Sequence, residues 1–368
     1  MMDLSEKTEN KMLPTLRIEK AEVTFPTVRY RGNKQKLISW ISKCLSEIEF
    51  SSFLDLMGGT GCVAYEFKKL GKQVLYNDVL KFNHIIGQSL IENCKKTISE
   101  KEINQLLKKN SDNRGFIPAT FKGLYFKDHE NEWIENTVTN ILELKDKYKM
   151  AIAFNALFQS CIIKRPFGIW HRANLYFREN KNNKPQSFGN GSSWERPFEI
   201  YFKRFIHEIN NAIFSNGKFN MSYNENAFDT KLTADLVYID SPYMKPNRRK
   251  SCRITNYQYY YHFLEGLANY ELWEKKIDKS KKTKPYTSEA EQRFLCPEEW
   301  KRDFGDLFNS FCNTTVAVSY LNGGIPSISD LKKLMKEYFY DVKGYKISHT
   351  HYLKKGYVEE WLLVGKPL

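Results

Sequence analysis

Residues 53–61 read Phe53-Leu-Asp-Leu-Met-Gly-Gly-Thr-Gly61 and continue as Cys62-Val-Ala-Tyr-Glu-Phe-Lys-Lys-Leu-Gly71. A short apolar run that breaks into glycines and resumes with apolar residues at helical spacing predicts a strand, a tight turn and a helix, which Gly71 ends. Glycines let the backbone approach a ligand closely, and the amides at the start of the helix can hold a carboxylate. The segment therefore predicts a pocket for an anionic group.

A second predicted strand, Gln73-Val-Leu-Tyr-Asn-Asp78, ends in a carboxylate where a βαβ unit places an acid that binds ribose hydroxyls. The turn lacks the GxGxxG spacing of a dinucleotide fold, and Asp55, just before the glycines, can pair with an ammonium group. A cofactor with an amino-acid tail fits better than a pyrophosphate. An ordinary strand-to-helix connection would explain the turn alone equally well. The candidate cofactor-binding residues are Asp55, Met57, Gly58, Gly59, Thr60, Gly61 and Asp78.

A third predicted strand, within Ala234-Asp-Leu-Val-Tyr-Ile-Asp-Ser-Pro-Tyr243, ends in an acid followed by Ser-Pro-Tyr. The exocyclic amine of adenine is a poor nucleophile because its lone pair is delocalised into the ring, and two hydrogen-bond acceptors would draw that pair back. Asp240 offers its side chain and Ser241 its backbone carbonyl, while Pro242 stiffens the turn and Tyr243 can stack on a base swung out of a duplex. A strand that happens to end in a proline turn is the alternative, but the three elements follow the order that one open sheet requires.

Composition adds weaker evidence. The chain has 57 Lys+Arg against 43 Asp+Glu, a formal charge of +14, which favours a polyanionic partner, although a solvated lysine-rich surface explains this charge equally well. The sequence contains no run of eighteen apolar residues, and its charged start lacks the apolar core of a signal peptide, so we expect a cytoplasmic protein without a membrane span. The cysteines are scattered, which predicts neither a metal site nor disulfides.

With these motifs the sequence resembles the DNA adenine-N6 methyltransferase family whose signature is Asp-Pro-Pro-Tyr, in the arrangement with a target-recognition segment inserted between the cofactor and catalytic motifs. The resemblance covers most of the chain. It implies an α/β fold with a Rossmann-like methyltransferase sheet, a closing antiparallel hairpin and a mainly helical inserted domain. It also implies S-adenosyl-L-methionine as the cofactor, double-stranded DNA as the substrate, and a cognate restriction endonuclease as a genetic partner.

Individual residues follow from this resemblance. Arg29-Tyr-Arg-Gly-Asn-Lys34 matches the family's N-terminal motif and implicates Tyr30 and Lys34 in cofactor binding, and Asn77-Asp78 matches its ribose-binding acid. Asp240-Ser-Pro-Tyr243 has Ser where Pro is usual, which is compatible with a role for the backbone carbonyl. Relatives that act on cytosine N4 more often begin this motif with Ser, so Asp240, which also borders the cofactor, favours adenine N6.

A further segment, Tyr223-Asn-Glu-Asn-Ala-Phe-Asp229, resembles the part of the family that holds the adenine ring of the cofactor. Asn226 and Asp229 are both candidates for this contact, and the sequence does not choose between them.

The remaining pattern predicts a catalytic domain from residues 1–84 and 220–368 and an inserted recognition domain from 85–219. The insertion contains a predicted buried helix at 149–158, and strands at 314–320, 345–353 and 360–364 with a helix at 329–338 are predicted to complete the sheet. Cations beside aromatic and amide side chains can neutralise phosphates and contact base edges, whereas an ordinary exposed loop is the alternative for each residue. The candidate DNA-binding residues are Arg165, His171, Arg172, Arg196, Arg248, Arg249 and Lys250.

Other functions remain open at this point. Cytosine N4, an RNA adenine and the side-chain amide of glutamine in a protein all present a planar amine to such a turn. A DNA-binding relative that has lost turnover is a further alternative, in which Ser241 would be a sign of decay. The presence of both Asp240 and Tyr243 argues against that loss.

Overall fold

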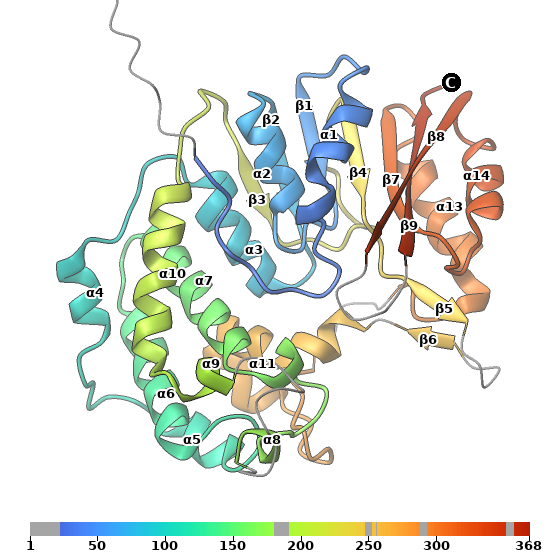
Figure 1. Ribbon diagram of the computed structural model, residues 1–368. Helices are drawn as coiled ribbons and strands as arrows, with labels where there is room; N and C mark the ends of the chain where they lie inside the picture. The colour runs from blue at the N-terminus through green and yellow to red at the C-terminus, as the bar shows by residue number, and fades with distance from the viewer. Residues whose placement is uncertain (1–22, 180–190, 247–251, 255, 288–292, 351–356) are drawn as a thin grey trace, which may run out of the picture.

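The computed structural model describes residues 23–179, 191–246, 252–254, 256–287, 293–350 and 357–368. Within this part of the chain a seven-stranded sheet forms the centre of the fold, in the order β3-β2-β1-β4-β7-β9-β8 (Figure 1). Its strands are β1 (Ser52–Asp55), β2 (Gln73–Asn77), β3 (Met221–Tyr223), β4 (Leu236–Ile239), β7 (Thr315–Leu321), β8 (Asp341–Thr350) and β9 (Tyr357–Lys366). A separate two-stranded hairpin, β5 (Met244–Pro246) and β6 (Cys252–Ile254), follows the third motif.

The sheet is parallel from β3 to β7 and closes with an antiparallel pair. β1 pairs with both β2 and β4 in parallel, and β4 pairs in parallel with β7. β9 runs antiparallel to both β7 and β8. The predicted Rossmann-like methyltransferase sheet with its closing hairpin is therefore confirmed, and the predicted strands at residues 314–320, 345–353 and 360–364 overlap β7, β8 and β9.

Successive strand residues point to opposite sides of the sheet, and both faces are buried by packed helices. Phe53 of β1 packs into a core that includes α1 (Ile38–Leu45) and α2 (Cys62–Lys69), while Leu54 packs into a second core with α13 (Trp300–Ser310) and α14 (Ile328–Met335). Figure 1 shows α13 and α14 beside the strands of the closing hairpin. The helices predicted after the glycine turn and at 329–338 are thus present as α2 and α14, and together these layers bury the sheet.

A helical layer follows β2 and fills the space below the sheet in Figure 1. The predicted buried helix at 149–158 lies within α7, whose residues 151–163 are all buried. The layer consists of α3 (Lys81–Gly87), the π-helical turn η2 (Gln88–Glu92), α4 (Glu100–Leu106), α5 (Phe116–Phe121), α6 (Asp128–Leu142), α7 (Lys147–Ile163), η3 (Pro166–Gly168), α8 (Tyr176–Glu179), α9 (Gly191–Glu195) and α10 (Phe198–Ala212).

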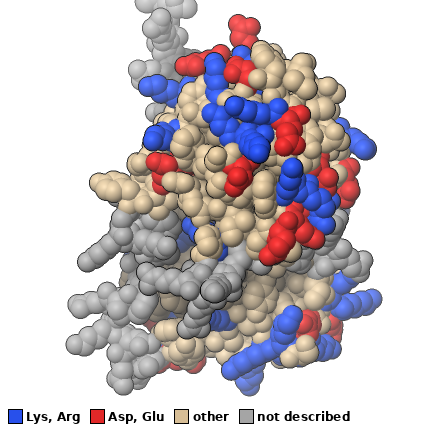
Figure 2. All heavy atoms as spheres, turned by 90° about the vertical axis from the view of Figure 1, so that its right-hand side faces the viewer, with Lys and Arg blue, Asp and Glu red and all other residues tan. Residues whose placement is uncertain are grey.

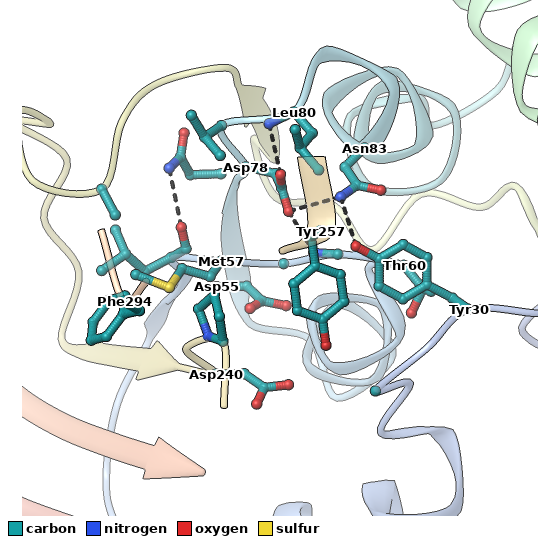
Figure 3. A pocket seen from close by; sticks show the side chains of 18 of the residues that line it. Tyr30, Asp55, Met57, Thr60, Asp78, Leu80, Asn83, Asp240, Tyr257 and Phe294 are labelled. Carbon is teal, nitrogen blue, oxygen red and sulfur yellow. Dashed lines mark hydrogen bonds between the residues drawn. The ribbon is translucent and has the colours of Figure 1, made fainter. Parts of the chain in front are cut away.

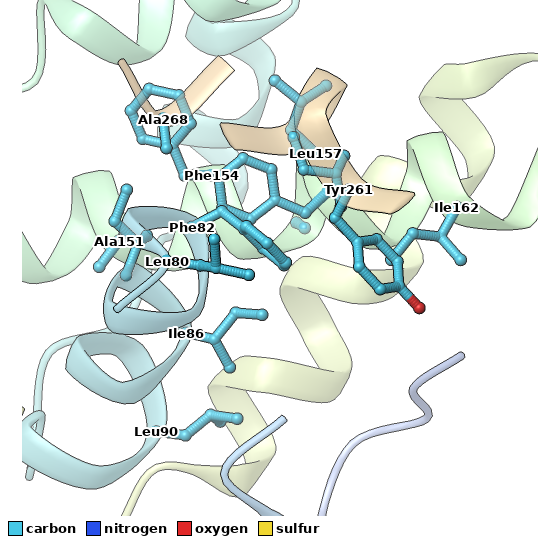
Figure 4. Packing of buried hydrophobic residues seen from close by; sticks show 14 of the residues in the cluster. Leu80, Phe82, Ile86, Leu90, Ala151, Phe154, Leu157, Ile162, Tyr261 and Ala268 are labelled. Carbon is cyan, nitrogen blue, oxygen red and sulfur yellow. The ribbon is translucent and has the colours of Figure 1, made fainter. Parts of the chain in front are cut away.

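The chain returns to this layer after the third motif. α11 (Tyr257–Ala268) packs against α3, where Phe82 contacts the ring of Tyr261 (Figure 4). Phe82 also contacts the ring of Phe158 in α7, which packs on α3. The backbone amide of Trp170 donates to the carbonyl of Tyr260 at 2.8 Å. Helices that precede β4 in the sequence and α11, which follows it, therefore share one core. The division into domains at 1–84, 85–219 and 220–368 stays a prediction.

The remaining short elements connect these layers. They are η1 (Gln35–Leu37), α12 (Tyr270–Trp273), η4 (Glu274–Lys276) and η5 (Pro297–Glu299). Among the described residues, no helix combines the length and apolar character that crossing a lipid bilayer requires.

Gly266 marks a close contact between α11 and α12. A Cβ atom at this position would lie 2.0 Å from Cε2 of Trp273, a residue that is fully buried. We expect Gly266→Ala to lower the free energy of unfolding by about 1–3 kcal/mol, because a methyl group in a filled core forces the surrounding atoms apart. Urea unfolding of the purified protein measures this loss.

Gly305, within α13, provides the matched control. There a Cβ would meet only the hydroxyl of Tyr338, at 3.2 Å, and that side chain can move. We expect Gly305→Ala to be neutral or stabilising, because alanine is favoured over glycine in a helix by about 1 kcal/mol. Equal destabilisation by both substitutions would contradict the proposed contact with Trp273.

Candidate active site

The two sequence motifs meet because β1 and β4 are parallel neighbours. Asp55 is paired with Tyr238, so the glycine turn and the Asp-Ser-Pro-Tyr turn both leave the sheet at its carboxyl edge. Residues of both turns line one pocket, among them Asp55 and Met57 from the first and Asp240 and Pro242 from the second, and Figure 3 shows Asp55, Met57 and Asp240 around it. The expectation that the three motif strands belong to one open sheet is confirmed, and the two turns share one rim of it.

The glycine turn is held by its own hydrogen bonds. The amide of Gly58 donates to the carbonyl of Asn77, that of Gly59 to the carboxylate of Asp78, and that of Gly61 to the carbonyl of Gly58, each at 2.9 Å. These three amides are therefore used within the protein. The expectation that amides at the start of α2 hold a carboxylate stays a prediction. Thr60, which lies between Gly59 and Gly61, also lines the pocket.

The reason for glycine differs along the turn. Gly59 and Gly61 adopt the left-handed backbone conformation, with φ of 54° and 74°. At Gly58 the constraint is contact, because a Cβ would lie 2.1 Å from the ring of Tyr76. The turn thus packs tightly on β2 while its outer surface borders the pocket.

Asp78 lies at the end of β2 and is almost fully buried beside the pocket. Its Oδ2 accepts hydrogen bonds from the Gly59 amide and the Asn83 side chain, and its Oδ1 accepts one from the Leu80 amide (Figure 3). Burial raises the pKa of Asp78 to about 6, although these hydrogen bonds act in the opposite direction. Asp78 is thus a fixed acceptor at the pocket wall, as a ribose ligand would need to be.

Asp55 is the most buried acid of the pocket, with 1% of its surface exposed. Its Oδ2 accepts a hydrogen bond from the Ala64 amide in the first turn of α2 at 3.2 Å. Burial, and next the nearby charge of Asp240, raise the pKa of Asp55 to about 8. A cation placed beside Asp55 would favour its ionised form, so this position suits an ammonium group.

Tyrosine rings form the wall opposite Asp55. Tyr30 stacks on Tyr261 with ring centroids 4.6 Å apart and on Tyr257 at 5.7 Å, both within 6° of parallel. Tyr30 and Tyr257 line the pocket. Tyr257 was not identified from the sequence, because nothing in its local pattern indicates that α11 returns to this wall.

Lys34 reaches the third motif. Its ammonium donates to Oδ1 of Asp240 at 2.8 Å and to the hydroxyl of Tyr243 at 2.5 Å. Burial opposes the positive charge, but the carboxylates of Asp240 and Glu360 more than offset it and raise the pKa of Lys34 above its usual range. Lys34 therefore lines the pocket as expected, with its charge directed at the third motif.

The Asp-Ser-Pro-Tyr turn is also bonded internally. The Tyr243 hydroxyl donates to Oδ1 of Asp240 at 2.8 Å, and the ring of Tyr243 packs edge-on against Tyr320 with centroids 5.3 Å apart. Ser241 is buried, and its Oγ has no hydrogen-bond partner within the described chain. The side chain of Tyr243 thus contacts Asp240 and Lys34 in this structure.

The far end of the pocket is apolar. Met57, Phe228 and Phe294 line it, together with Asn226. The side-chain amide of Asn226 donates to Oδ2 of Asp229 at 3.0 Å, and Asn226 itself borders the cavity. Of the two candidates from the sequence, Asn226 therefore lies at the wall, and Asp229 holds it.

Phe294 was not expected from the sequence. Its backbone adopts the left-handed region with φ of 59°, and its amide donates to Asp303 at 2.8 Å. Arg293 pairs with Asp303 and Asp306 and lies over the ring of Phe228 at 4.4 Å. These contacts hold Phe294 against the pocket although it is distant in sequence from the other lining residues.

Known proteins resemble this chain over most of its length. The D12 class N6 adenine-specific DNA methyltransferase family matches residues 30–282, which is more than half of the sequence. The chain belongs to this family. The resemblance inferred from the motifs is confirmed, and the protein is an adenine-specific DNA methyltransferase.

Individual relatives of this chain are also named as methyltransferases or methylases. The methyltransferase is 28% identical over 284 residues to the type II methyltransferase M2.HphI of Haemophilus parahaemolyticus, covering 70% of this chain and 80% of that protein. It is 23% identical over 326 residues to the type II methyltransferase M.NlaIII of Neisseria lactamica, covering 84% and 88%. It is also 28% identical over 354 residues to the modification methylase StsI of Streptococcus sanguinis, covering 89% of this chain and 49% of that longer protein.

Arg165 of the methyltransferase is placed differently from the expectation. Only 3% of its surface is exposed, and its guanidinium donates to the carbonyls of Tyr125, Ile169 and Arg172. A guanidinium committed to three backbone carbonyls inside the protein is a structural group. The expectation that Arg165 contacts DNA is therefore corrected, because the surrounding fold buries it.

The other candidate DNA contacts are spread over the helical layer. Arg172 and Arg196 are exposed, whereas His171 is half-buried and packs edge-on against Tyr260 at 5.5 Å. The Tyr260 ring is also covered by the guanidinium of Arg31, which lines the pocket. Arg248, Arg249 and Lys250 lie outside the described residues.

The raised pKa of Asp55 has a measurable effect on the stability of the methyltransferase. Between about pH 4 and pH 8 the carboxyl holds its proton in the folded protein but not in the unfolded chain, so its contribution to stability is lost as the pH rises. We expect the melting temperature of Asp55→Asn, relative to wild type, to increase from pH 5 to pH 8. Thermal unfolding at several pH values measures this difference.

Asp235, at the opposite end of β4, is the matched control. Its carboxylate accepts hydrogen bonds from the amides of Ser51 and Ser52, which lower its pKa. It is ionised in both the folded and the unfolded state above pH 5, so we expect the effect of Asp235→Asn to be constant over the same range. A constant difference for Asp55→Asn as well would contradict the raised pKa.

Proposed function

We propose that this methyltransferase uses S-adenosyl-L-methionine to methylate N6 of an adenine that is swung out of a specific site in double-stranded DNA. The observation that carries the proposal is the shared pocket, in which Asp55 ends β1 while Asp78 and Asp240 follow β2 and β4. A cofactor held by the first two acids would lie beside an amine bound by the third.

The residues of the pocket fit this cofactor. Asp55 is a buried acid without a basic partner in the described chain and suits an α-ammonium group, and Asp78 suits ribose hydroxyls. Met57, Phe228 and Phe294 form an apolar end for the adenine ring. When bound, the cofactor supplies a methyl group activated by a positively charged sulfur.

The third motif would prepare the amine. Asp240 and the carbonyl of Ser241 can each accept one N–H of the exocyclic group, which draws its lone pair back to nitrogen. The target base needs an aromatic surface, for which we propose Tyr243 as the stacking ring. In this structure the Tyr243 hydroxyl is bonded to Asp240, so its ring already lies beside the proposed amine site.

The helical layer is the proposed DNA-reading part. We propose that residues 85–219 form the target-recognition domain and that 1–84 with 220–368 form the catalytic domain. Arg172, His171 and Arg196 lie on the helical layer, and Arg172 precedes α8. The Tyr260 ring, which contacts both His171 and Arg31, links this surface to the pocket.

Charge on another face of the molecule does not indicate a DNA surface. Figure 2 shows Lys and Arg side chains interspersed with Asp and Glu over the side that carries α13, α14 and β8. Several of these cations are paired, as in Lys301 with Glu337 and Arg302 with Glu299. The positive net charge is thus partly balanced by local acids on this side, which favours the helical layer as the DNA side.

A biological role follows from the relatives. Some of them are named modification methylases, including StsI and LlaI. We propose that this chain likewise protects DNA against a cognate restriction endonuclease, which would be its genetic partner.

The proposed reaction is tested by its product. We expect DNA incubated with the enzyme and S-adenosyl-L-methionine, and then digested to nucleosides, to yield N6-methyladenine. Asp240→Ala should lower the rate by about 10²–10³-fold, the loss typical when one preorganised hydrogen-bonding group is removed, while cofactor and DNA still bind.

Asp235→Asn provides a control on the same strand, because Asp235 lies at the edge opposite the pocket. It should methylate DNA at the wild-type rate per folded molecule. N4-methylcytosine as the only product would refute the choice of base, and undiminished transfer by Asp240→Ala would refute the role of Asp240.

The proposed DNA side predicts a salt effect. Arg172→Ala should weaken DNA binding and reduce the slope of log K against log salt concentration by about 1, because one phosphate contact is lost. Arg302, an exposed arginine on the face with α13, is the control and should leave this slope unchanged when replaced by alanine. Identical slopes for wild type and Arg172→Ala, measured by fluorescence anisotropy, would exclude Arg172 from the interface.

A further inference from the structure

The two carboxylate oxygens of Asp240 have different surroundings. Oδ1 accepts hydrogen bonds from Lys34 and from the Tyr243 hydroxyl, each at 2.8 Å. Within the described part of the chain, Oδ2 has no hydrogen bond, although Asp240 lines the pocket and a fifth of its side chain is exposed. Oδ2 is therefore the oxygen left for a ligand.

Lys34 is fixed at this position by its neighbours. Its carbonyl accepts the Leu37 amide at 2.7 Å, which closes the turn of η1, and only 5% of its side chain is exposed. The ammonium also donates to the Tyr243 hydroxyl, which in turn donates to Asp240. Lys34, Tyr243 and Asp240 thus form a closed ring of three hydrogen bonds at the carboxyl edge of the sheet.

A second acid supports this ammonium. Glu360 of β9 is paired in register with Leu321, the last residue of β7, so it lies at the same edge of the sheet as Asp240. Its surface is 7% exposed, and its carboxylate adds to the field that keeps Lys34 charged. Burial raises the pKa of Glu360 itself, and the charge of Lys34 opposes that increase. The ammonium is therefore bonded to Asp240 and lies in the field of a second acid at the same edge of the sheet.

We propose that Lys34 is a positioning residue for the amine acceptor: it binds Oδ1 of Asp240, fixes the orientation of that carboxylate, and leaves Oδ2 directed to the target N–H. This inference rests on the proposed function, since it assigns a role in presenting the amine. It differs from the role that the family resemblance gave Lys34, which was binding of the cofactor. The difference arises because the ammonium is bonded to Asp240 and Tyr243.

The charge balance yields a specific consequence. Removing one partner of a buried ion pair leaves the other charge without compensation, whereas removing both together costs much less. Asp240→Asn leaves a single acceptor oxygen at this position and removes the negative charge, so it no longer needs a cation. The effect of replacing Lys34 should therefore depend on which residue stands at position 240.

The experiment is a double-mutant cycle on the full-length enzyme with wild type, Lys34→Met, Asp240→Asn and the double variant. Single-turnover methyl transfer to DNA is measured at saturating labelled S-adenosyl-L-methionine, and the cofactor dissociation constant is measured separately. We expect Lys34→Met to lower the rate by about 10²-fold with the cofactor constant within about threefold of wild type. The double variant should be within about threefold of Asp240→Asn.

Two further variants separate positioning from structure. Lys34→Arg keeps the charge and should retain a rate within about tenfold of wild type. Lys68→Met is the control for a buried lysine, because the Lys68 ammonium donates to the carbonyls of Leu90 and Asn93, away from the pocket. It should lower the melting temperature and leave the rate per folded molecule unchanged.

Several results would overturn the inference. One is a weaker cofactor constant for Lys34→Met with a normal rate at saturation, which would make Lys34 a cofactor ligand. Others are losses that multiply independently in the double variant, and equal losses for Lys34→Arg and Lys34→Met. If Lys34→Met does not fold, two other comparisons still test whether Lys34 acts through Asp240. These are the double variant with Asp240→Asn, and Lys34→Arg with wild type. Wild-type enzyme that forms only N4-methylcytosine would refute the proposed base, whereas N6-methyladenine with independent losses would refute this inference alone.

Discussion

Backbone pairing between β1 and β4 brings the glycine turn and the Asp-Ser-Pro-Tyr turn of this methyltransferase together. Leu54 lies opposite Val237, and beyond the paired residues the Leu56 amide still donates to the carbonyl of Tyr238 at 3.0 Å. Because the two strands are parallel, both end at the same edge of the sheet, and the turns that follow them can face each other. A shift of one residue in this register would reverse the faces of a strand whose residues are buried on both sides.

The pocket that results contains three acids, Asp55, Asp78 and Asp240, at one edge of the sheet. Asp55 and Asp78 are held by backbone and amide donors, whereas Asp240 is held by an ammonium and a phenol. Burial raises the pKa of Asp55 to about 8 and that of Asp78 to about 6, and such differences let neighbouring carboxyl groups serve different roles. The tyrosine wall and the apolar end with Phe294 enclose these acids and reduce their contact with water.

Local patterns predicted the parts of the protein that local patterns determine. The glycine turn, the strand ending at Asp240 and the buried helix in α7 depend on short-range spacing, and each was predicted from the sequence. Residues that act through distant contacts could not be predicted in this way. Phe294 reaches the pocket because Asp303 and Arg293 hold it, and Arg165 is buried because it bonds to carbonyls of two separate segments, Tyr125 and the loop with Ile169 and Arg172. β3 has only three residues, too few for a periodic pattern to show.

The burial of Arg165 also has a consequence for recognition. Its side chain joins the carbonyls of Ile169 and Arg172 to that of Tyr125, so the loop that carries His171 and Arg172 is tied to the helical core at several points. A loop that already has its final shape loses little conformational entropy when a partner arrives. The ordering cost of this loop is met during folding, so in the proposed complex with DNA more of the free energy of its contacts is available for discrimination between sequences.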